Sequence, residues 1–231
     1  MSYRIGTYQD PDVLEAKLVD ELCGRLQHAI RMRGHASLVV SGGRTPLGLF
    51  RRLSQADIDF SKLSVYLCDE RWVDIDHPDS NARQVKTVFM QGAAAQVEFL
   101  PMYAEGVEAE LHARRLNTFF GDLPKFDVVV LGMGMDGHTA SLFPGAQGVA
   151  QALDPNNQCA VVAVTPLDAP HERLTLTASR LLNTRALYLQ ISGKDKNDLL
   201  QNILSTPGNT LPIATFLHQT QVRLDIFTTV G

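Results

Sequence analysis

FDVVVLGMGMDGHTASLFPG, residues 126–145, joins a short apolar run to a glycine-rich loop. The run from Asp127 to Leu131 is short, continuous and followed directly by glycine, which is typical of a strand buried in a parallel sheet. The glycines that follow allow the chain to turn at the end of this strand, and they leave Asp136 and His138 at the mouth of the turn. The stretch therefore predicts a parallel strand with polar side chains at its carboxyl end.

Similar apolar runs occur on both sides of this stretch, and helical patterns separate them. The clearest helix is expected from Pro11 to Arg33, with Gly34 ending the pattern. Further helices are expected at residues 47–53, 105–120 and 194–204, and further strands at Ser37 to Val40, Leu63 to Leu67, Ala160 to Val164, Arg173 to Thr177, Ala186 to Ile191 and Val222 to Thr228. Alternating strands and helices imply crossover connections, so we predict one α/β domain over residues 1–231: a doubly wound, mostly parallel open sheet with helices on both faces.

Composition excludes several classes of protein. The chain has 231 residues, 45% of them hydrophobic, which is enough for one buried core. Its formal net charge is -4 and it has no basic runs, so neither nucleic acid nor an acidic membrane surface is an expected partner. The odd number of cysteines fits a reducing compartment, and Cys68 is expected in the core. Without a secretory signal or a run of about 18 apolar residues, the chain is predicted to be soluble and cytoplasmic.

The glycine-rich loop also matches the dinucleotide pattern G-x-G-x-x-G, at Gly132 to Gly137. A dinucleotide fold needs a long helix after this pattern and an acidic residue at the end of the next strand. Here Pro144-Gly145 interrupts any helix within two turns, and the strand ending at Val164 is followed by a loop in which Asp168 comes too late. We therefore predict a Rossmann-like sheet that binds no dinucleotide.

Two interpretations of His138 fit the sequence. It could cap or pack against its own loop, or it could act as a general base, because an imidazole titrates near neutral pH and Asp136 is close enough to orient it. Neither residue belongs to a metal-binding pattern. The other histidines are expected at the surface: His28, His35, His77, His112, His171 and His218. We assign no metal and no cofactor.

A second glycine-rich segment, SGGRTP at Ser41 to Pro46, lies between an expected strand and an expected helix. Gly42 and Gly43 allow backbone N–H groups to turn inward, and Thr45 is expected to cap the helix. Free N–H groups at a helix N-terminus attract phosphate or carboxylate. An ordinary strand-to-helix turn has the same pattern, so both interpretations stay open here.

Charged side chains follow other expected strands. In Asp69-Glu70-Arg71, the arginine could hold an anion or stabilise an oxyanion, or the three residues could form a salt-bridge cluster. Lys194 opens the helix after the strand ending at Ile191 and could bring a positive charge to the same edge, although lysines in exposed first turns are usually solvated. Arg173 could likewise come from a loop, or pair with its neighbour Glu172 at the surface.

Together these segments resemble the 6-phosphogluconolactonase family, relatives of the glucosamine-6-phosphate isomerase/deaminases. The resemblance extends over nearly the whole chain, and the long glycine-aspartate-histidine stretch is its most specific part. It is carried by S-G-G-x-T-P at 41–46, D-E-R-x-V at 69–73, Ser80-Asn81, G-M-G-x-D-G-H-T-A-S-L-F-P-G at 132–145, P-x-x-R-x-T-L-T at 170–177 and G-K-x-K at 193–196.

The resemblance implies that the chain hydrolyses 6-phospho-D-glucono-1,5-lactone to 6-phosphogluconate in the pentose phosphate pathway, so its partner is a phosphorylated sugar lactone. It makes His138 the catalytic base that activates water, with Asp136 aligning the imidazole, and we assign Arg71 to the oxyanion. The residues expected to bind substrate or phosphate are Ser41, Gly42, Gly43, Arg44, Thr45, Asp69, Arg173 and Lys194.

Two alternative functions are weighed against lactone hydrolysis. The deaminase relatives follow the D-G-H core with a stretch ending F-N-E-P, whose glutamate assists sugar-ring opening. This chain has Ser141-Leu142-Phe143-Pro144 there, which lacks the acid that an isomerisation needs and favours the lactonase. A non-catalytic sugar-phosphate sensor would usually carry a DNA-binding segment, and the first thirty or so residues predict one amphipathic helix and no helix-turn-helix. The sequence assigns no oligomeric state.

Overall fold

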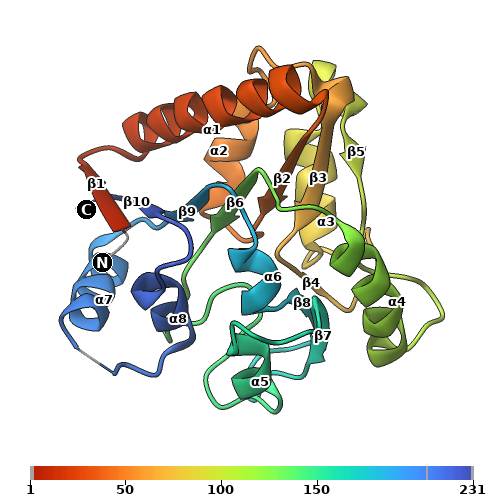
Figure 1. Cartoon of the computed structure of the whole chain (residues 1–231), viewed down its shortest axis with the longest axis vertical. Coiled ribbons are helices and arrows are strands. Elements are labelled where there is room, and N and C mark those ends of the chain that lie inside the picture. Colours follow the sequence, from red (N-terminus) through yellow and green to blue (C-terminus); the bar gives the residue numbers. More distant parts are fainter. Residues whose placement is uncertain (1–2, 207, 230–231) are drawn as a thin grey trace.

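A parallel sheet of seven strands forms the centre of the molecule within residues 3–206 and 208–229, which the computed structural model describes (Figure 1). The strand order is β1-β10-β9-β6-β2-β3-β5, and neighbouring strands pair in parallel. The strands are β1 Tyr3–Tyr8, β2 Ala36–Val40, β3 Leu63–Leu67, β5 Glu98–Phe99, β6 Val128–Leu131, β9 Leu187–Gln190 and β10 Leu224–Thr229. The predicted mostly parallel sheet is confirmed.

Helix α1 (Pro11–Arg33) has the predicted bounds, and its ends show why. The Asp10 side chain accepts a hydrogen bond from the backbone N–H of Asp12, and Gly34 takes the left-handed conformation, with φ 78°, that ends many helices. Its buried face carries leucines at helical spacing: Leu14, Leu18, Leu22 and Leu26. Neither α1 nor any other helix within the described ranges is long and apolar enough to cross a membrane.

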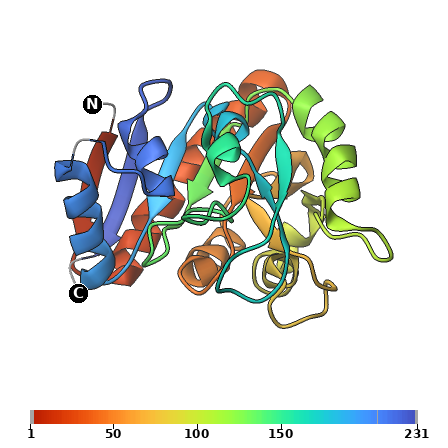
Figure 2. The same cartoon turned by 90° about the horizontal axis from the view of Figure 1, so that it is seen from below.

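Helices cover both faces of the sheet, as predicted. In Figure 2, α2 and α3 lie on one side of the sheet and α4 lies on the other. The remaining helical bounds are α2 Pro46–Leu53, η1 Phe60–Lys62, α3 Asn81–Gln84, η2 Val85–Phe89, η3 Gly92–Gln96, α4 Ala109–Asp122, α5 Val149–Leu153, α6 Ala178–Leu182, α7 Lys194–Ser205 and α8 Pro212–His218. No helix directly follows Gly137, since the next one is the short α5, and this agrees with the prediction that the loop does not open a dinucleotide fold.

Two of the predicted strands belong to a separate small sheet. Strands β7 (Val161–Val164) and β8 (Arg173–Leu176) pair antiparallel with each other, and β8 pairs antiparallel with β4 (Asp69–Arg71). The prediction that these runs continue the parallel alternation is therefore wrong. The residues 165–172 between β7 and β8 are too few for a parallel crossover, which needs about a dozen residues or more.

The direction of the chain reverses between β2 and β6, which lie side by side in the sheet. From β2 the chain continues toward β3, and from β6 it continues toward β9 on the opposite side. Such a switch point leaves a crevice beyond the carboxyl ends of the two strands, where ligands of open α/β sheets bind. The two glycine-rich segments follow these two strands, so both lie at the crevice.

Candidate active site

A cavity of about 340 Å³ lies at the switch point of the sheet. The loops after β2 and β6 form one part of its wall, and Asp69, Arg71 and Arg173 of the small antiparallel sheet form another. Lys196, from α7, adds a third part. Concave sites of this size, with a few convergent polar groups, are typical of small-molecule binding sites.

His138 and Asp136 form a hydrogen-bonded pair beside this cavity. The His138 Nδ1 lies 2.5 Å from the Asp136 Oδ1, which also accepts the backbone N–H of His138 at 3.2 Å. The imidazole packs against Phe143 with 4.5 Å between the ring centroids, and its side chain is 32% exposed. Because the carboxylate occupies the Nδ1 side, Nε2 is the nitrogen available to exchange a proton with a bound molecule. The ring thus both packs within its own loop and keeps one nitrogen free, so the general-base role of His138 stays a prediction.

The glycines of this loop make the pair possible. A Cβ on Gly134 would lie 2.2 Å from the His138 Cε1 and Nδ1 atoms, so any side chain at this position would displace the imidazole. The loop is closed by a hydrogen bond from the Gly134 N–H to the His138 carbonyl at 2.9 Å. Gly137 has φ 78°, and its carbonyl accepts from the Ile213 N–H of α8 at 3.0 Å. The loop is thus shaped around the histidine.

The loop after β2 is joined to the rest of the cavity by its side chains and backbone. Ser41 Oγ bridges the ends of β2 and β6, donating to the Val130 carbonyl and accepting from the Gly132 N–H, both at 3.2 Å. The Gly43 N–H donates to Gln84 at 3.0 Å. Thr45 makes no capping hydrogen bond through its side chain and has helical backbone angles, so the predicted Thr45 cap is wrong.

Arg71 and Arg173 lie opposite each other on β4 and β8. Arg173 is buried, and its Nη2 donates to the Pro170 carbonyl at 3.1 Å, while the Arg71 Nη1 donates to the Asn81 Oδ1 at 3.0 Å. In both arginines the Nε is buried without a hydrogen-bond partner among the described residues. Burial, followed by the neighbouring charge of Arg71, lowers the pKa of Arg173. Two adjacent cations with unused donors are the arrangement expected of an anion site.

The acidic residues of this segment hold the arginines indirectly. The buried Glu70 accepts hydrogen bonds from the backbone N–H groups of Arg71, Asn81 and Ala82 at 2.7–2.8 Å, and so fixes the start of α3. Burial raises the pKa of Glu70, and these hydrogen bonds oppose the rise. Asp69 lines the cavity and accepts from Ser141 Oγ. Neither carboxylate forms a salt bridge with Arg71 within the described ranges, so the predicted salt-bridge cluster is not formed.

The cations of the cavity wall lack acidic partners. None of them forms a salt bridge with any carboxylate of residues 3–206 and 208–229, and Asp69 is the one carboxylate of that part of the chain in the wall. These cations are Arg44, Arg71, Arg173 and Lys196. Burial, followed by the charge of Arg44, lowers the pKa of Lys196. In a chain of net charge -4, the cavity wall therefore carries a local excess of positive charge.

Comparison with known proteins identifies the family. The model for glucosamine-6-phosphate isomerases/6-phosphogluconolactonase matches residues 9–225. The chain belongs to this family. It is 39% identical to a 6-phosphogluconolactonase of Rhizobium meliloti, over 98% of this chain and 99% of the relative, and 37% identical to one of Pseudomonas putida, over 97% and 92%. The crystal structure of a 6-phosphogluconolactonase from Shewanella baltica, 39% identical, superimposes with a TM-score of 0.93 and covers 97% of both chains.

Most of the site residues predicted for this family member lie together. The cavity wall contains Ser41, Gly42, Gly43, Arg44, Thr45, Asp69, Arg71, His138 and Arg173, and Asp136 contacts His138. Lys194 does not line the cavity: its ammonium pairs with Asp198 at the surface, one turn along α7. The lysine of this helix that lines the cavity is Lys196.

Sequence reasoning also missed Asn81 and Gln190 as lining residues. A signal existed for Asn81, because the Ser80-Asn81 pair is part of the family resemblance. The structure shows its physical role: its Nδ2 donates to the Asp69 carbonyl at 2.9 Å while its Oδ1 holds Arg71. A Cβ on Gly42 would lie 1.9 Å from the same Oδ1, so a glycine at this position leaves room for the Asn81 side-chain amide. Gln190 ends β9 and carries no such pattern.

The position at which deaminases of this family carry a glutamate is apolar here. Phe143 lines the cavity between His138 and Arg173, with the Arg173 guanidinium carbon 5.4 Å from its ring centroid. Leu142 is buried, and Ser141 is engaged by Asp69. Among the described residues, Asp69 is the one carboxylate of the wall, and Asp136 is the carboxylate paired with His138.

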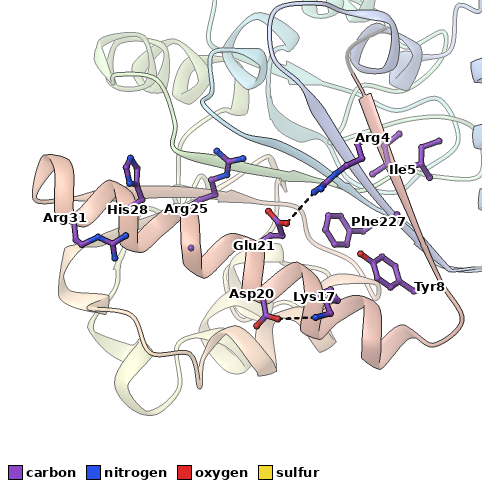
Figure 3. A pocket seen from close by; sticks show the side chains of 13 residues that line it. Arg4, Ile5, Tyr8, Lys17, Asp20, Glu21, Arg25, His28, Arg31 and Phe227 are labelled. Atoms are coloured by element: carbon purple, nitrogen blue, oxygen red, sulfur yellow. Dashed lines mark hydrogen bonds and ion pairs between the residues drawn. The ribbon is translucent and has the colours of Figure 1, made fainter.

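A second, wider hollow of about 820 Å³ lies between α1 and the edge strand β1 with its neighbour β10 (Figure 3). Two of its four cations are paired, whereas Arg25 and Arg31 form no salt bridge with the described residues. Arg4 contacts Glu21 at 3.4 Å and Asp225 at 3.0 Å, and Lys17 lies 3.9 Å from Asp20. This hollow contains no histidine paired with a carboxylate, and we assign it no function.

Proposed function

We propose that this chain is a 6-phosphogluconolactonase, which hydrolyses 6-phospho-D-glucono-1,5-lactone to 6-phosphogluconate. The carrying observation is that a carboxylate-oriented histidine faces a cavity whose four cations have no acidic partners in the described part of the chain. Such a cavity suits a doubly charged phosphate ester together with an ester carbonyl that becomes negative during attack. The names of the relatives support the same activity. A cytoplasmic location stays a prediction from the sequence.

In the proposed mechanism, His138 Nε2 takes a proton from a water molecule as the water oxygen attacks the lactone carbonyl carbon. The bond from this carbon to the ring oxygen then breaks, and the imidazolium returns the proton to that oxygen. Asp136 accepts the Nδ1–H, which fixes the ring and stabilises its transient positive charge. General-base assistance of this kind contributes typically about 10²–10⁴-fold to the rate.

We assign the developing oxyanion to Arg71. Its guanidinium is fixed before substrate arrives by the Asn81 Oδ1 and by the Asp79 carbonyl, so little reorganisation is needed when charge develops. Arg44, Arg173 and Lys196 are assigned to the phosphate. Preorganised donors aimed at an oxyanion contribute about 3 kcal/mol in other hydrolases.

The test is an assay of the purified full chain with three substrates. Freshly prepared 6-phosphogluconolactone should release acid much faster than its spontaneous hydrolysis. The unphosphorylated lactone should react with a far lower kcat/KM, because the cations have no phosphate to hold. Glucosamine 6-phosphate should release no ammonia. An absence of acceleration with the phosphorylated lactone, or ammonia release from the amino sugar, would contradict the proposal.

A further inference from the structure

Two histidines that were expected separately at the surface, His77 and His171, meet Asp79 beside the active-site cavity. His77 and Asp79 lie between β4 and α3, and His171 lies between β7 and β8. The His171 Nε2 is 3.0 Å from the Asp79 Oδ2, and the His77 Nδ1 is 3.9 Å from the same oxygen. The two imidazoles contact each other edge to face, with 5.2 Å between centroids. One ligand atom from each of the three residues lies within 4.8 Å of the others.

From this arrangement we propose that His77, Asp79 and His171 form a binding site for a divalent transition-metal ion of the zinc type. Two histidines and one carboxylate are a donor set that zinc uses in proteins, with bond lengths of about 2.0–2.2 Å. Ligands around a tetrahedral ion at these distances are about 3.3 Å apart. The observed separations of 3.0 and 3.9 Å fall on either side of this value, so small side-chain rotations close the site.

The backbone already holds the two segments in place. Arg71 pairs with Arg173 across β4 and β8, and the next backbone hydrogen bond runs from the Trp72 N–H to the Glu172 carbonyl at 2.7 Å. His171 follows directly and has φ 70°, a left-handed conformation that directs its chain away from the strand. The strand pairing therefore sets the two segments beside each other where they begin.

The protonation and exposure of the cluster also fit metal uptake. The His77 Nδ1 accepts the Asp79 N–H at 3.1 Å, so this nitrogen carries no proton, and a metal ion would have to replace this hydrogen bond at its lone pair. The side chains of His77, Asp79 and His171 are 41%, 53% and 27% exposed, which gives an ion access from solvent. A metal ion would replace the His171–Asp79 hydrogen bond and release its proton.

One neighbouring charge opposes the ion. The Arg71 Nη1 donates to the Asp79 carbonyl, so a cation lies beside the cluster, and we expect reversible rather than permanent binding. The same contact links the proposed metal site to the active-site cavity. A bound ion would join residues 72–80 to residues 165–172, the two segments next to Arg71 and Arg173, and so brace the arginine side of the active-site cavity. The proposal does not rest on the lactonase activity.

The experiment is a zinc titration of the full chain after removal of metal, read by competition with a chelating dye and by the melting temperature. Wild type should bind one Zn²⁺ at the cluster and melt at a higher temperature with zinc. His77→Gln, His171→Gln and Asp79→Asn should each weaken binding at least about 10-fold, since loss of mere outer partners of metal ligands costs about 10–100-fold. His218→Gln, which changes an exposed histidine at the end of α8, should bind as wild type does.

Zinc could instead bind the His138–Asp136 pair, so His138→Ala is titrated in parallel. Retention of the zinc-induced melting shift in His138→Ala and its loss in the cluster variants would support the proposal. Loss of all binding in His138→Ala, or unchanged affinity in all three cluster variants, would overturn it. Asp79→Asn keeps the shape of the side chain, and ¹H–¹⁵N spectra of the histidine rings in wild type identify the metal-bound nitrogens without any substitution.

Discussion

The two hollows of this protein differ in what their charges do. In the wider one, beneath α1, Arg4 is paired with Glu21 and Asp225 and Lys17 lies near Asp20, whereas Arg25 and Arg31 form no salt bridge with the described residues (Figure 3). The narrower one, at the switch point, has four cations without a carboxylate partner in the described ranges and an oriented histidine. Paired side chains such as Arg4 have little left for a ligand, whereas four unpaired cations beside an oriented histidine are available to an anion. Volume alone would select the wrong hollow.

The backbone explains why the unmatched charges are tolerated. The cations of the narrower hollow come from a strand pair, a loop and a helix that approach it from different sides, and their nearest fixed partners are neutral oxygens such as the Asn81 Oδ1 and the Pro170 carbonyl. Their mutual repulsion lowers the pKa of Arg173 and of Lys196, after the larger effect of burial. An anionic ligand relieves this repulsion, so the free protein should be stabilised by phosphate-bearing ligands.

The largest expected effect comes from removing the oriented histidine. His138→Ala should lower kcat by about 10²–10⁴-fold, because it removes the proposed proton acceptor. Binding of 6-phosphogluconate, measured by calorimetry, should change little, since the cations stay in place. Asp136→Asn, which keeps the shape but reverses the hydrogen bond to Nδ1, should lower kcat by a smaller factor. If His138→Ala keeps near wild-type turnover, the histidine is not the base. The oriented histidine would then no longer distinguish the switch-point cavity from the wider hollow.

The next effect tests the unmatched arginines. Arg173→Gln should lower kcat/KM for the phosphorylated lactone by about 10–100-fold, because hydrogen bonds to charged groups contribute about 1.5–3 kcal/mol. Arg173→Lys should restore part of the loss by returning the charge without the planar fork. The matched control is Arg31→Gln, an exposed arginine that lines the wider hollow, which should leave kcat/KM unchanged. Equal losses in the two arginine variants would remove the distinction between the hollows.

Local sequence patterns were enough for the parts of the fold that are determined locally. The leucine spacing and Gly34 predict α1 to its last residue, and the apolar runs predict the central strands to within two or so residues. The partner and direction of β8 are not local, because all four of its residues are buried and such a run looks the same in either sheet. Only the short connection 165–172 signalled the antiparallel pair.

The active-site cavity and the proposed metal site were likewise predictable only where local sequence determines them. Each glycine-rich segment directly follows its own strand, β2 or β6. The two segments meet because these strands end side by side at the switch point. His77, Asp79 and His171 meet only because β4 pairs with β8, which joins residues 92 positions apart. Lys194 and Lys196 look equivalent in sequence, but residues two apart on a helix do not share a face, and the packing of α7 decides which of them lines the cavity. Side-chain direction on a helix is set by tertiary packing, which no local pattern contains.

That difference between the two lysines gives a smaller, sharper prediction. Lys196→Ala should weaken binding of 6-phosphogluconate by about 10-fold, whereas Lys194→Ala should change it less than about twofold, since the Lys194 ammonium is paired at the surface with Asp198. Calorimetric titration of both variants is the measurement. The reverse order of effects would return the phosphate role to Lys194.

Because the pKa of Lys196 is lowered, its contribution to ligand binding should depend on pH. The charged form binds phosphate, and burial together with Arg44 makes the lysine lose its proton below the ordinary value of 10.5. As pH rises, the affinity of wild type for 6-phosphogluconate should therefore begin to fall at a lower pH than it would if the phosphate were bound by an exposed lysine. The fall should be absent in Lys196→Ala. A wild-type profile parallel to that of Lys196→Ala would show that this lysine does not contact the ligand.

The smallest effect is expected where charges are matched. Arg4→Gln removes contacts to Glu21 and Asp225 in the wider hollow, but the Arg4 side chain is 54% exposed and Asp225 keeps Arg223 at 3.0 Å. The free energy of unfolding in urea should therefore fall by no more than about 1 kcal/mol, as for other exposed ion pairs. The kcat/KM for the lactone should stay within about twofold of wild type, because the cations of the switch-point cavity are untouched. A tenfold loss of kcat/KM in Arg4→Gln, with unchanged stability, would mean that the wider hollow takes part in the reaction and that matched charges do not exclude a role in it.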